Sequence, residues 1–442
     1  MKLFSALIST LLLISFVHAE DWPQWRGPSG QGHAKATGLP ATWSETENVV
    51  WKTAIPGRGW SSPVIAGDQI WVTTAIETAA KPEDATRRTK SNTGNQPLTV
   101  LESVSLRAVC IDRRTGRVLD NVELLNEKEP QWVHRLNSYA SPTPVLENGR
   151  LYAHFGTFGT ACLDTKSGKV IWANRDLKLI HENGPGSSPV VSGDFVIFHC
   201  DGSDVQYIAG LDKRTGKLAW KTPRSGAMNA NPQLKKAYGT PLIAEFAGKS
   251  ELLSPAADWL YSYEPTTGKE LWKLKYEVLG FSIVPRPVTG HGMIYFSTSF
   301  MKSEMLAVRY DGTQPPQIAW RYKKGAPQMP SPILVDDALY FVTDSGGIVT
   351  CLDAKTGEER WRERLGGEFS ASPLFADGKL YFPSRDGFTA VLAPGKEFKL
   401  LAKNTLDSGH FASPAAVDGA FYLRTEKSLY RIERKPAKTA AR

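Results

Sequence analysis

The sequence predicts an all-β fold, an eight-bladed β-propeller of four-stranded antiparallel blades. A Pro opens an apolar run eight times along the 442-residue chain. After one longer gap these prolines recur every 41 to 52 residues; they are Pro63, Pro144, Pro189, Pro241, Pro287, Pro332, Pro373 and Pro414. A second element, Asp-x-x-Thr/Ser-Gly-x-x-x-Trp, occurs at 164–172, 212–220 and 353–361. Repeats of about 40 to 50 residues made of short strands are typical of propeller blades.

Each repeat supplies four strands. The Pro run forms the first strand, and a loop such as Glu147-Asn148-Gly149 turns it into the second. The Asp-x-x-Thr-Gly segment then joins the third strand to the fourth, because Asp can cap its own turn and Gly supplies the positive φ that a tight hairpin needs. The segment 264–272 is a variant that begins with Glu, and Asp120 stands at the Trp position of the first repeat.

The two ends of the repeat region predict a closed ring. One strand, at 48–54, precedes Pro63, and three strands follow Pro414 and end near Glu433. One plus three make a complete blade, so the N-terminal strand is expected to close the last blade and to remove the free sheet edges.

Four further segments complete the domain organisation. Residues 1–19 have a charged start at Lys2, an apolar core and a small-residue site ending at Ala19, which predicts a signal peptide. Residues 20–47 form a lead-in to the propeller at 48–434. Residues 75–101 are an insertion in the first blade, with little apolar content, and are expected to be a mobile loop. The basic tail 435–442 is expected to be disordered.

Bulk properties narrow the setting of the protein. The signal peptide predicts a periplasmic or secreted bacterial protein, with no Cys after the cleavage site for lipid attachment and no transmembrane segment. The formal net charge of +8 falls to about +7 without Lys2. This mild excess, without a basic helix or an aromatic register, predicts no nucleic-acid partner.

The four cysteines are expected to be free. Cys110, Cys162 and Cys351 occupy the same position of three repeats, just before an apolar-Asp pair. Equivalent positions in different blades should lie further apart than the ~7 Å between Cα atoms that a disulfide allows. Cys200 lies in another strand and is the one candidate for an exception.

Six tryptophans fall on outermost strands. We expect each indole to dock between neighbouring blades, with its N–H bonded to a carbonyl. The alternative is a stacking surface for sugars or quinones, but the fixed spacing after Gly favours packing. The six are Trp51, Trp172, Trp220, Trp272, Trp320 and Trp361.

The Asp-x-x-Thr-Gly-x-x-x-Trp element resembles the tryptophan-docking motif of pyrroloquinoline quinone (PQQ) dehydrogenases and of the outer-membrane assembly factor BamB. The resemblance extends from about Trp22 to Glu433. The opening segment 22–28 and the closing segment 421–425 are similar to a branch of bacterial PQQ-like propeller-repeat proteins. This resemblance implies the fold and says little about catalysis, because the motif belongs to blade packing.

Quinone dehydrogenases of this fold need a metal held by acidic and amide oxygens, an Asp base and flat platforms for the cofactor. The chain has no adjacent Cys pair and no Cys-x-x-Cys-His segment, and Asp201-Gly202-Ser203-Asp204 is interpreted as a turn. No His pair has metal-ligand spacing. We therefore predict no catalytic residue, no metal and no cofactor, with PQQ plus calcium as the alternative.

A ligand is expected at one mouth of the ring, where the loops before each Pro converge. These loops are enriched in His, Arg and aromatic residues, which suits a polar funnel that tolerates anions; the alternative is that they solvate a channel. His134, Asn137, His181 and Trp60 are neighbours in blade order, whereas His154 and His199 are expected to be packed. The candidate ligand-facing residues are Arg58, Trp60, His134, Asn137, Tyr139, His181, Asn183, Lys236, Tyr238, Arg286, Gln328, Phe369 and His410.

The function predicted first is that of an exported, non-catalytic, monomeric binding or scaffold protein of the cell envelope, with a protein or peptide partner. The second candidate is a PQQ-dependent sugar or alcohol dehydrogenase with a reduced site. The residues expected to neutralise the carboxylates of PQQ are Arg58, Lys235, Lys236 and Arg286. The third is glycan binding through Trp60.

Overall fold

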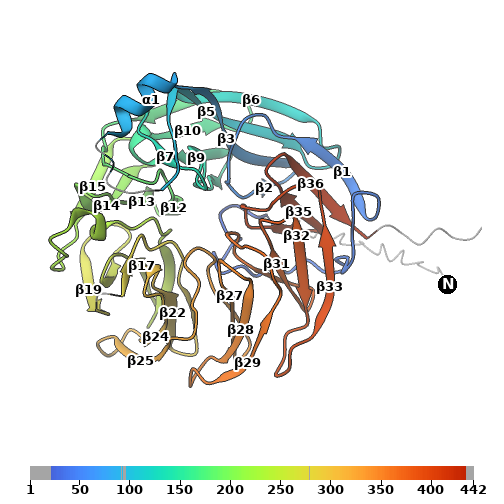
Figure 1. Cartoon of the computed structure of the whole chain (residues 1–442). Coiled ribbons are helices and arrows are strands. Elements are labelled where there is room, and N and C mark those ends of the chain that lie inside the picture. Colours follow the sequence, from blue (N-terminus) through green and yellow to red (C-terminus); the bar gives the residue numbers. More distant parts are fainter. Residues whose placement is uncertain (1–20, 91, 93–95, 278, 435–442) are drawn as a thin grey trace, which may run out of the picture.

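The computed structural model describes residues 21–90, 92, 96–277 and 279–434. Eight four-stranded sheets follow one another around a ring (Figure 1), which confirms the predicted eight-bladed propeller. Two short two-stranded sheets and one α-helix decorate it. The predicted signal peptide and basic tail lie outside the described residues.

Blades are numbered here in chain order of their innermost strands. Blade 1 contains β2 (Val64–Ala66), β3 (Gln69–Ala79), β5 (Leu101–Asp112) and β6 (Val118–Lys128); blade 2 contains β8 (Val145–Glu147), β9 (Arg150–His154), β10 (Thr160–Asp164) and β11 (Val170–Asn174). Blade 3 contains β12 (Val190–Ser192), β13 (Phe195–Asp201), β14 (Gln206–Asp212) and β15 (Leu218–Pro223); blade 4 contains β16 (Leu242–Phe246), β17 (Lys249–Pro255), β18 (Trp259–Tyr263) and β19 (Glu270–Lys275).

Blade 5 contains β21 (Val288–Gly290), β22 (Met293–Ser297), β24 (Met305–Arg309) and β25 (Gln317–Tyr322); blade 6 contains β26 (Ile333–Val335), β27 (Ala338–Val342), β28 (Ile348–Asp353) and β29 (Glu359–Arg364). Blade 7 contains β30 (Leu374–Ala376), β31 (Lys379–Pro383), β32 (Phe388–Leu392) and β33 (Leu400–Thr405); blade 8 contains β34 (Ala415–Val417), β35 (Ala420–Arg424), β36 (Ser428–Glu433) and β1 (Val49–Ala54). The short segments are α1 (Pro82–Thr89), β4 (Leu98–Thr99), β7 (Val133–His134), β20 (Gly280–Phe281), β23 (Phe300–Met301) and the 3₁₀ turns η1 (Gly156–Phe158) and η2 (Pro232–Lys235).

Strand direction gives the ring two different faces. Within each blade the sheet is antiparallel, so the loops that enter the innermost strand and those that join the second strand to the third lie on one side, called here the loop face. The Asp-x-x-Thr-Gly turns and the turns between the first two strands lie on the other side, called the turn face.

The first strand of the chain closes the ring as predicted. β1 pairs antiparallel with β36, from Val49 opposite Ile432 to Ala54 opposite Ser428. Blade 8 therefore combines both ends of the repeat region. The pairing of β1 with β36 covers the edge that β36 would otherwise expose.

A ring of hydrogen bonds, called here the axial ring, links the blades around the axis. The residue before the opening Pro of a blade donates its backbone N–H to the hydroxyl of the equivalent Ser or Thr in the next blade, at 2.9 to 3.0 Å. All seven hydroxyl residues are buried. The eighth position is Arg286, which has no hydroxyl. The pairs, donor first, are Ser62 to Thr143, Thr143 to Ser188, Ser188 to Thr240, Arg286 to Ser331, Ser331 to Ser372, Ser372 to Ser413, and Ser413 to Ser62.

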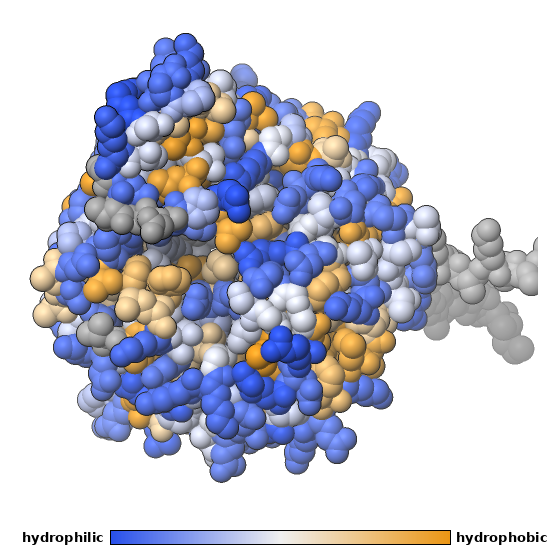
Figure 2. Space-filling model, in the orientation of Figure 1, coloured by the Kyte–Doolittle hydropathy of each residue, from blue (hydrophilic) through white to orange (hydrophobic). Residues whose placement is uncertain are grey.

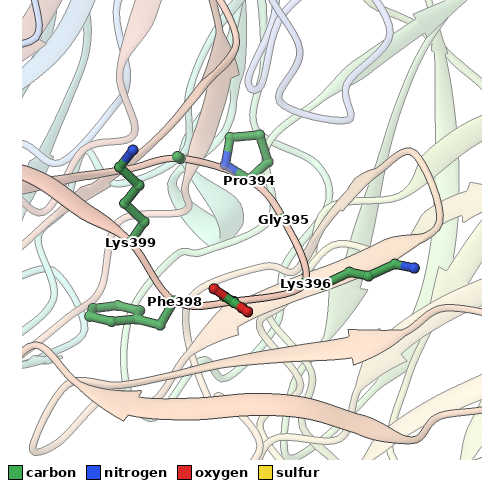
Figure 3. A pocket seen from close by; sticks show the side chains of 7 residues that line it. Pro394, Gly395, Lys396, Phe398 and Lys399 are labelled. Carbon is green, nitrogen blue, oxygen red and sulfur yellow. The ribbon is translucent and has the colours of Figure 1, made fainter.

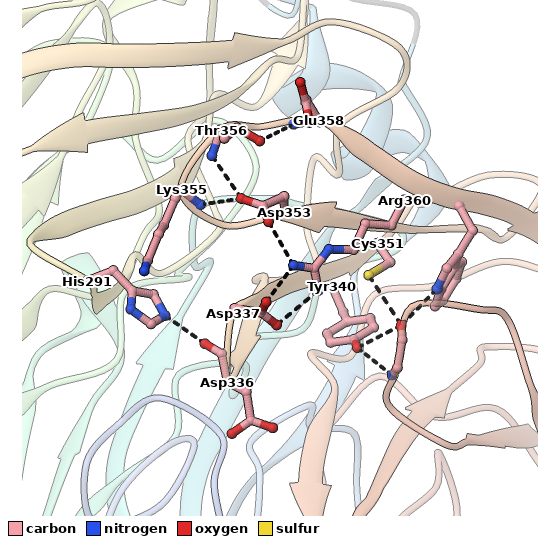
Figure 4. Close-up of polar contacts among 12 residues, drawn as sticks. His291, Asp336, Asp337, Tyr340, Cys351, Asp353, Lys355, Thr356, Glu358 and Arg360 are labelled. Carbon is pink, nitrogen blue, oxygen red and sulfur yellow. Dashed lines mark hydrogen bonds and ion pairs between the residues drawn. The ribbon is translucent and has the colours of Figure 1, made fainter.

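The turns on the opposite face are held by their Asp side chains. Figure 4 shows the turn of blade 6, where a carboxylate oxygen of Asp353 accepts the N–H groups of Lys355 and Thr356, both at 3.0 Å. Arg360 bonds to Asp353 at 2.7 Å and bidentately to Asp337, and so ties the two hairpins of this blade together. Gly357 has a φ of +75°, which a side chain would strain.

Indoles contact these turns across blade boundaries. Trp172 donates its Nε1–H to the carbonyl of Lys213 in the next blade at 3.1 Å, and its ring lies over Gly216. Trp51, Trp320 and Trp361 make the same bond, each at 3.1 Å, to the carbonyls of Arg113, Ala354 and Gly395.

The other two indoles differ. Trp272 donates to the carboxylate of Glu251 in its own blade at 3.0 Å, and Glu251 also accepts from Tyr310 of blade 5. Trp220 lies against Gly268 of the next blade, but its Nε1 is buried without a hydrogen-bond partner among the described residues.

The lead-in completes the packing at one irregular boundary, the one between blades 7 and 8. Blade 7 has Ala402, opposite Val391 in the register, where six of the other seven blades have Trp. Trp43 packs there between Tyr381 and Phe421, with ring centroids 6.3 and 5.7 Å away. Its backbone N–H is fixed by Asn404 at 3.0 Å. A tryptophan from outside the repeats thus fills the boundary between blades 7 and 8.

The lead-in also crosses the axis on the turn face. Trp22 pairs with Ile65 of blade 1, and the carbonyl of Pro23 accepts from Leu146 of blade 2. Further along, Gln31 bonds to blade 5, His33 to blade 6 and Gly32 to blade 7. Because blades 5 and 6 lie opposite blades 1 and 2 in a ring of eight, the segment crosses the axis.

The expectation of an irregular loop at 75–101 is wrong in its local structure. β3 and β5 extend to 11 and 12 residues, and α1 follows, on the loop face. The cause is local: Pro82 begins the helix, and Glu83 and Asp84 in its first turn and two arginines in its last turn suit the helix dipole. β4 then pairs with β7 and attaches the insertion to blade 2.

The cysteine prediction is confirmed. Cys110, Cys162, Cys200 and Cys351 are all buried and free. Burial raises the pKa of the Cys110, Cys162 and Cys200 thiols to about 12, so they stay protonated and unreactive at neutral pH.

Replacing one hydroxyl of the axial ring should weaken the whole fold. Ser372→Ala leaves the buried N–H of Ser331 without its acceptor, and we expect the free energy of unfolding in urea to fall by about 1 to 3 kcal/mol. The control Ser345→Ala removes an exposed hydroxyl on the loop face and should change it by less than about 0.5 kcal/mol. Equal effects of the two variants would contradict a special role of the ring.

Candidate functional site on the loop face

The loops between blades 2, 3 and 4 bring several predicted residues into one network. Asn183 is its centre: its carbonyl accepts from the backbone of His134 at 3.2 Å and from the amide of Asn137 at 2.9 Å. The Asn183 amide donates to the hydroxyl of Tyr238 at 3.3 Å, and this hydroxyl donates to the carbonyl of His181. These five residues are called here the mouth network. It contains His134, Asn137 and His181 of the four residues expected to be neighbours, and Trp60 lies outside it.

Two side chains of the mouth network are also held by bonds to their own or neighbouring loops. The Asn137 amide also donates to Pro185, and its side-chain oxygen accepts from Ser138 and Ser141. His134 accepts from the N–H of Leu136 at 3.1 Å through Nδ1. The network is therefore a rigid support for the loop face.

The histidines of this face are neutral at physiological pH. Burial lowers the pKa of His181 to about 3 and that of His410 to about 4. Burial, and then the charge of Arg135, lowers the pKa of His134. His154 and His199 are buried in β9 and β13, which confirms that they are packed. None of the three shifted mouth histidines, His134, His181 and His410, supplies a positive charge to a ligand.

Several other predicted funnel residues are buried behind the surface. Tyr139 and Phe369 are fully covered, and the Tyr139 hydroxyl donates to the carbonyl of Gln131. Burial lowers the pKa of Lys236, whose ammonium group bonds to Gln233 at 2.5 Å. Arg286 is also buried and lies at the axial ring. The chain brings these residues to the mouth region, with their side chains turned into the protein.

An aromatic and arginine stack stands at the boundary of blades 8 and 1. Trp60 and Phe411 are parallel, with centroids 4.3 Å apart and planes 12° apart. Arg58 lies over Trp60 at 5.3 Å and Arg385 over Phe411 at 5.9 Å. The Trp60 indole donates to the carbonyl of Leu136 at 3.1 Å and so connects the stack to blade 2. The half-exposed stack offers a flat, positively charged contact surface.

A pair of residues that the sequence analysis missed protrudes from the same face. β20 and β23 pair through Gly280–Met301 and Phe281–Phe300, and they place Phe300 54% and Met301 62% exposed. Phe281 contacts Phe300 edge to face at 5.6 Å. The only signal in the sequence is the apolar Phe300-Met301 pair in a link where blades 6, 7 and 8 have short polar turns. Figure 2 shows apolar side chains gathered at the left of this face, over blades 3 to 5.

The loop that carries Gln328 is anchored by a buried carboxylate. Asp344 accepts the backbone N–H groups of Gln328 at 2.5 Å and Met329 at 2.8 Å. Burial raises the pKa of Asp344 to about 6, although these two hydrogen bonds oppose the shift. The anchor therefore changes its protonation just below neutral pH.

Two concavities lie on the turn face. One, of about 410 Å³, is lined entirely by the single loop 393–399 (Figure 3), and the other, of about 220 Å³, lies among turns of blades 4 and 5. A hollow lined by a single loop brings no residues of different blades together, so it makes a poor ligand site.

The described residues contain no cluster of three or more His, Cys, Asp or Glu side chains placed to hold a metal ion. In this part of the chain no helix has the length and apolarity to cross a bilayer.

Fold and site together define a closed propeller of PQQ-type repeats. A family model described as "Outer membrane protein assembly factor BamB" matches residues 34–222, 206–335 and 257–395. These matches together extend over residues 34 to 395, well over half of the chain, and the chain belongs to this family. No curated protein matches it.

Solved structures share the fold at low sequence identity. A europium-containing methanol dehydrogenase is 11% identical, with 92% of this chain and 90% of that one covered and a TM-score of 0.62. BamB from Moraxella catarrhalis is 14% identical, with 78% and 99% covered and a TM-score of 0.52. A quinohemoprotein alcohol dehydrogenase from Comamonas testosteroni is 12% identical, with 96% and 82% covered and a TM-score of 0.58. Such likeness shows the propeller fold alone.

The titration of Asp344 should be visible in stability. Its pKa is higher in the folded protein than the ordinary 3.8, so its contribution is fully present below pH 3.8 and is lost as the pH rises through about 6. Asp344→Asn removes this titration. The stability of the wild type relative to the variant should fall by about 3 kcal/mol between pH 3.5 and pH 7, at ~1.4 kcal/mol per pH unit. Parallel curves from urea denaturation over this range would contradict the assignment.

Proposed function

We propose that the protein is a non-catalytic binding propeller of the bacterial cell envelope, which takes a segment of a partner protein on its loop face. Membership of the family described as an outer membrane assembly factor supports an envelope role. The similarity to BamB of Moraxella catarrhalis supports a protein partner.

The observation that carries this proposal is the exposed apolar pair Phe300 and Met301, held on a short β-ribbon above blades 4 and 5. Apolar side chains with more than half of their surface in water are costly unless a partner covers them. Aromatic residues, Met and Arg are also enriched where proteins bind one another. The Trp60 and Phe411 stack supplies the second such group on the same face.

The chemistry of the loop face supports binding over catalysis. The polar atoms of Asn137 and Asn183 are hydrogen-bonded to neighbouring loops, and His181 is buried and neutral. A general acid or base needs a titratable group within reach of the substrate. The mouth network instead fixes the loops that a partner would contact.

The residues of this face do not fit a calcium-bound quinone. Calcium needs six to eight oxygen ligands, several of them from carboxylates. Here Asp201 is paired with Arg224, Glu368 with Arg385, and Asp344 with two backbone N–H groups. These three carboxylates are thus used within the protein. The described residues also contain no cluster of three or more His, Cys, Asp or Glu side chains placed to hold a metal ion, which argues against the dehydrogenase alternative.

Site-specific photocrosslinking tests the binding proposal. A photoreactive phenylalanine analogue at position 300 should crosslink to one discrete envelope protein in the producing cell. The same analogue at position 171, an exposed apolar position on the outermost strand of blade 2 near the turn face, should not. Met301→Asp should reduce the adduct at 300 at least tenfold. Equal adducts at 300 and 171 would contradict the proposal.

Titration with PQQ and calcium tests the rejected alternative. We expect no saturable change in tryptophan fluorescence at micromolar PQQ, because the described residues contain no cluster of carboxylates placed to hold the calcium ion. Saturable quenching that Trp60→Ala abolishes, together with turnover of an alcohol or sugar, would replace the binding function with a quinone enzyme.

A further inference from the structure

Three buried arginines have no carboxylate partner among the described residues, and two of them, Arg26 and Arg286, lie at the axis. Arg26 and Arg286 are each 1% exposed, and Arg424 is buried beside Ser61 and Thr73. Among the described residues none of the three forms an ion pair, and all their hydrogen-bond acceptors are carbonyl or hydroxyl oxygens. Arg224 shows the contrast, because it is equally buried and pairs with Asp201 at 2.7 Å.

Arg26 is the least satisfied of the three. Its Nη2 donates to the carbonyls of Pro332 at 2.7 Å and Gln31 at 3.0 Å. Its Nε and Nη1 are buried and have no hydrogen-bond partner in the described part of the chain. Two donors of a cationic group are therefore left without an acceptor inside the protein.

Arg286 brings a second positive charge to the same place. Its Nη1 donates to the carbonyl of Trp25, the residue before Arg26, at 3.0 Å, and to Gly30 at 3.3 Å. Burial and the charge of Arg286 lower the pKa of Arg26 to about 9, and burial lowers that of Arg286 to about 9. Both guanidinium groups remain charged at pH 7.

The surroundings supply further donors and no negative charge. The hydroxyls of Ser331 and Ser372 accept backbone N–H groups, and their own protons have no acceptor among the described residues. Burying an unpaired charge costs several kcal/mol, and native proteins almost always compensate it. A bound anion would compensate the charge of these two guanidinium groups.

We propose that the axis holds one small monovalent inorganic anion of the halide type, bound at an unpartnered donor of Arg26, Nε or Nη1, and neutralising the pair that Arg26 forms with Arg286. The site favours a small ion because the guanidinium groups lie against bare backbone: a Cβ at Gly30 would be 2.4 Å from Arg286 Nη1, and one at Gly32 2.8 Å from Arg26 Nη2. The crossing lead-in closes the site on the turn face.

Crystals of the whole chain grown in bromide provide the direct test. An anomalous peak within hydrogen-bonding distance of Arg26 Nε or Nη1 is the expected result. A water molecule there at saturating bromide, or bromide bound only on the surface, would overturn the proposal. This measurement uses the wild-type protein and does not depend on a variant that folds.

Urea denaturation in chloride and gluconate mixtures of constant ionic strength gives the second test. With one site, the logarithm of the folding constant should rise with the logarithm of chloride concentration, with a slope approaching 1 above the dissociation constant. Arg26→Met should reduce the slope to near zero, and Arg117→Met, which removes an exposed arginine, should leave it unchanged. A wild-type slope of zero, or equal slopes in all three proteins, would overturn the site.

Discussion

The axial ring of hydrogen bonds is the constraint on which the rest of the propeller depends. Each donor directly precedes a Pro, which has no N–H of its own, so its amide is the last donor before the innermost strand begins. Its use in a bond to the next blade pairs this buried donor and sets the spacing of adjacent blades at seven of the eight boundaries. The bond from Ser413 to Ser62 then closes the circle between the last blade and the first.

A second circle of contacts lies at the periphery on the turn face. Gly216 and Gly357 leave room for the indoles of the preceding blades, since a Cβ there would lie 2.4 and 2.6 Å from the rings. This requirement explains why Gly and Trp occur together in the repeat. Where blade 7 lacks its Trp, Trp43 fills the boundary from outside the repeats. The lead-in is therefore part of the propeller core.

The sequence predicts the blades well because each depends on local chemistry: a Pro, an Asp-capped turn and a periodic strand. It predicts the site less well because burial depends on contacts between blades. Tyr139 and Phe369 lie in the expected loops, yet neighbouring loops cover them. Phe300 and Met301 escaped notice because β23 pairs with β20, about twenty residues earlier, and no repeat pattern records that pairing.

The single break in the axial ring coincides with the axial charge. At position 286 the ring loses one bond between blades, since Arg replaces the hydroxyl residue. The guanidinium makes up for it with bonds to Pro241 of blade 4 and to Trp25 and Gly30 of the lead-in. The break therefore attaches the lead-in to the ring from within, but it does so with a buried positive charge beside Arg26. Attaching the lead-in across the axis in this way places two buried positive charges side by side. The crossing of the lead-in and the proposed anion site therefore share one cause.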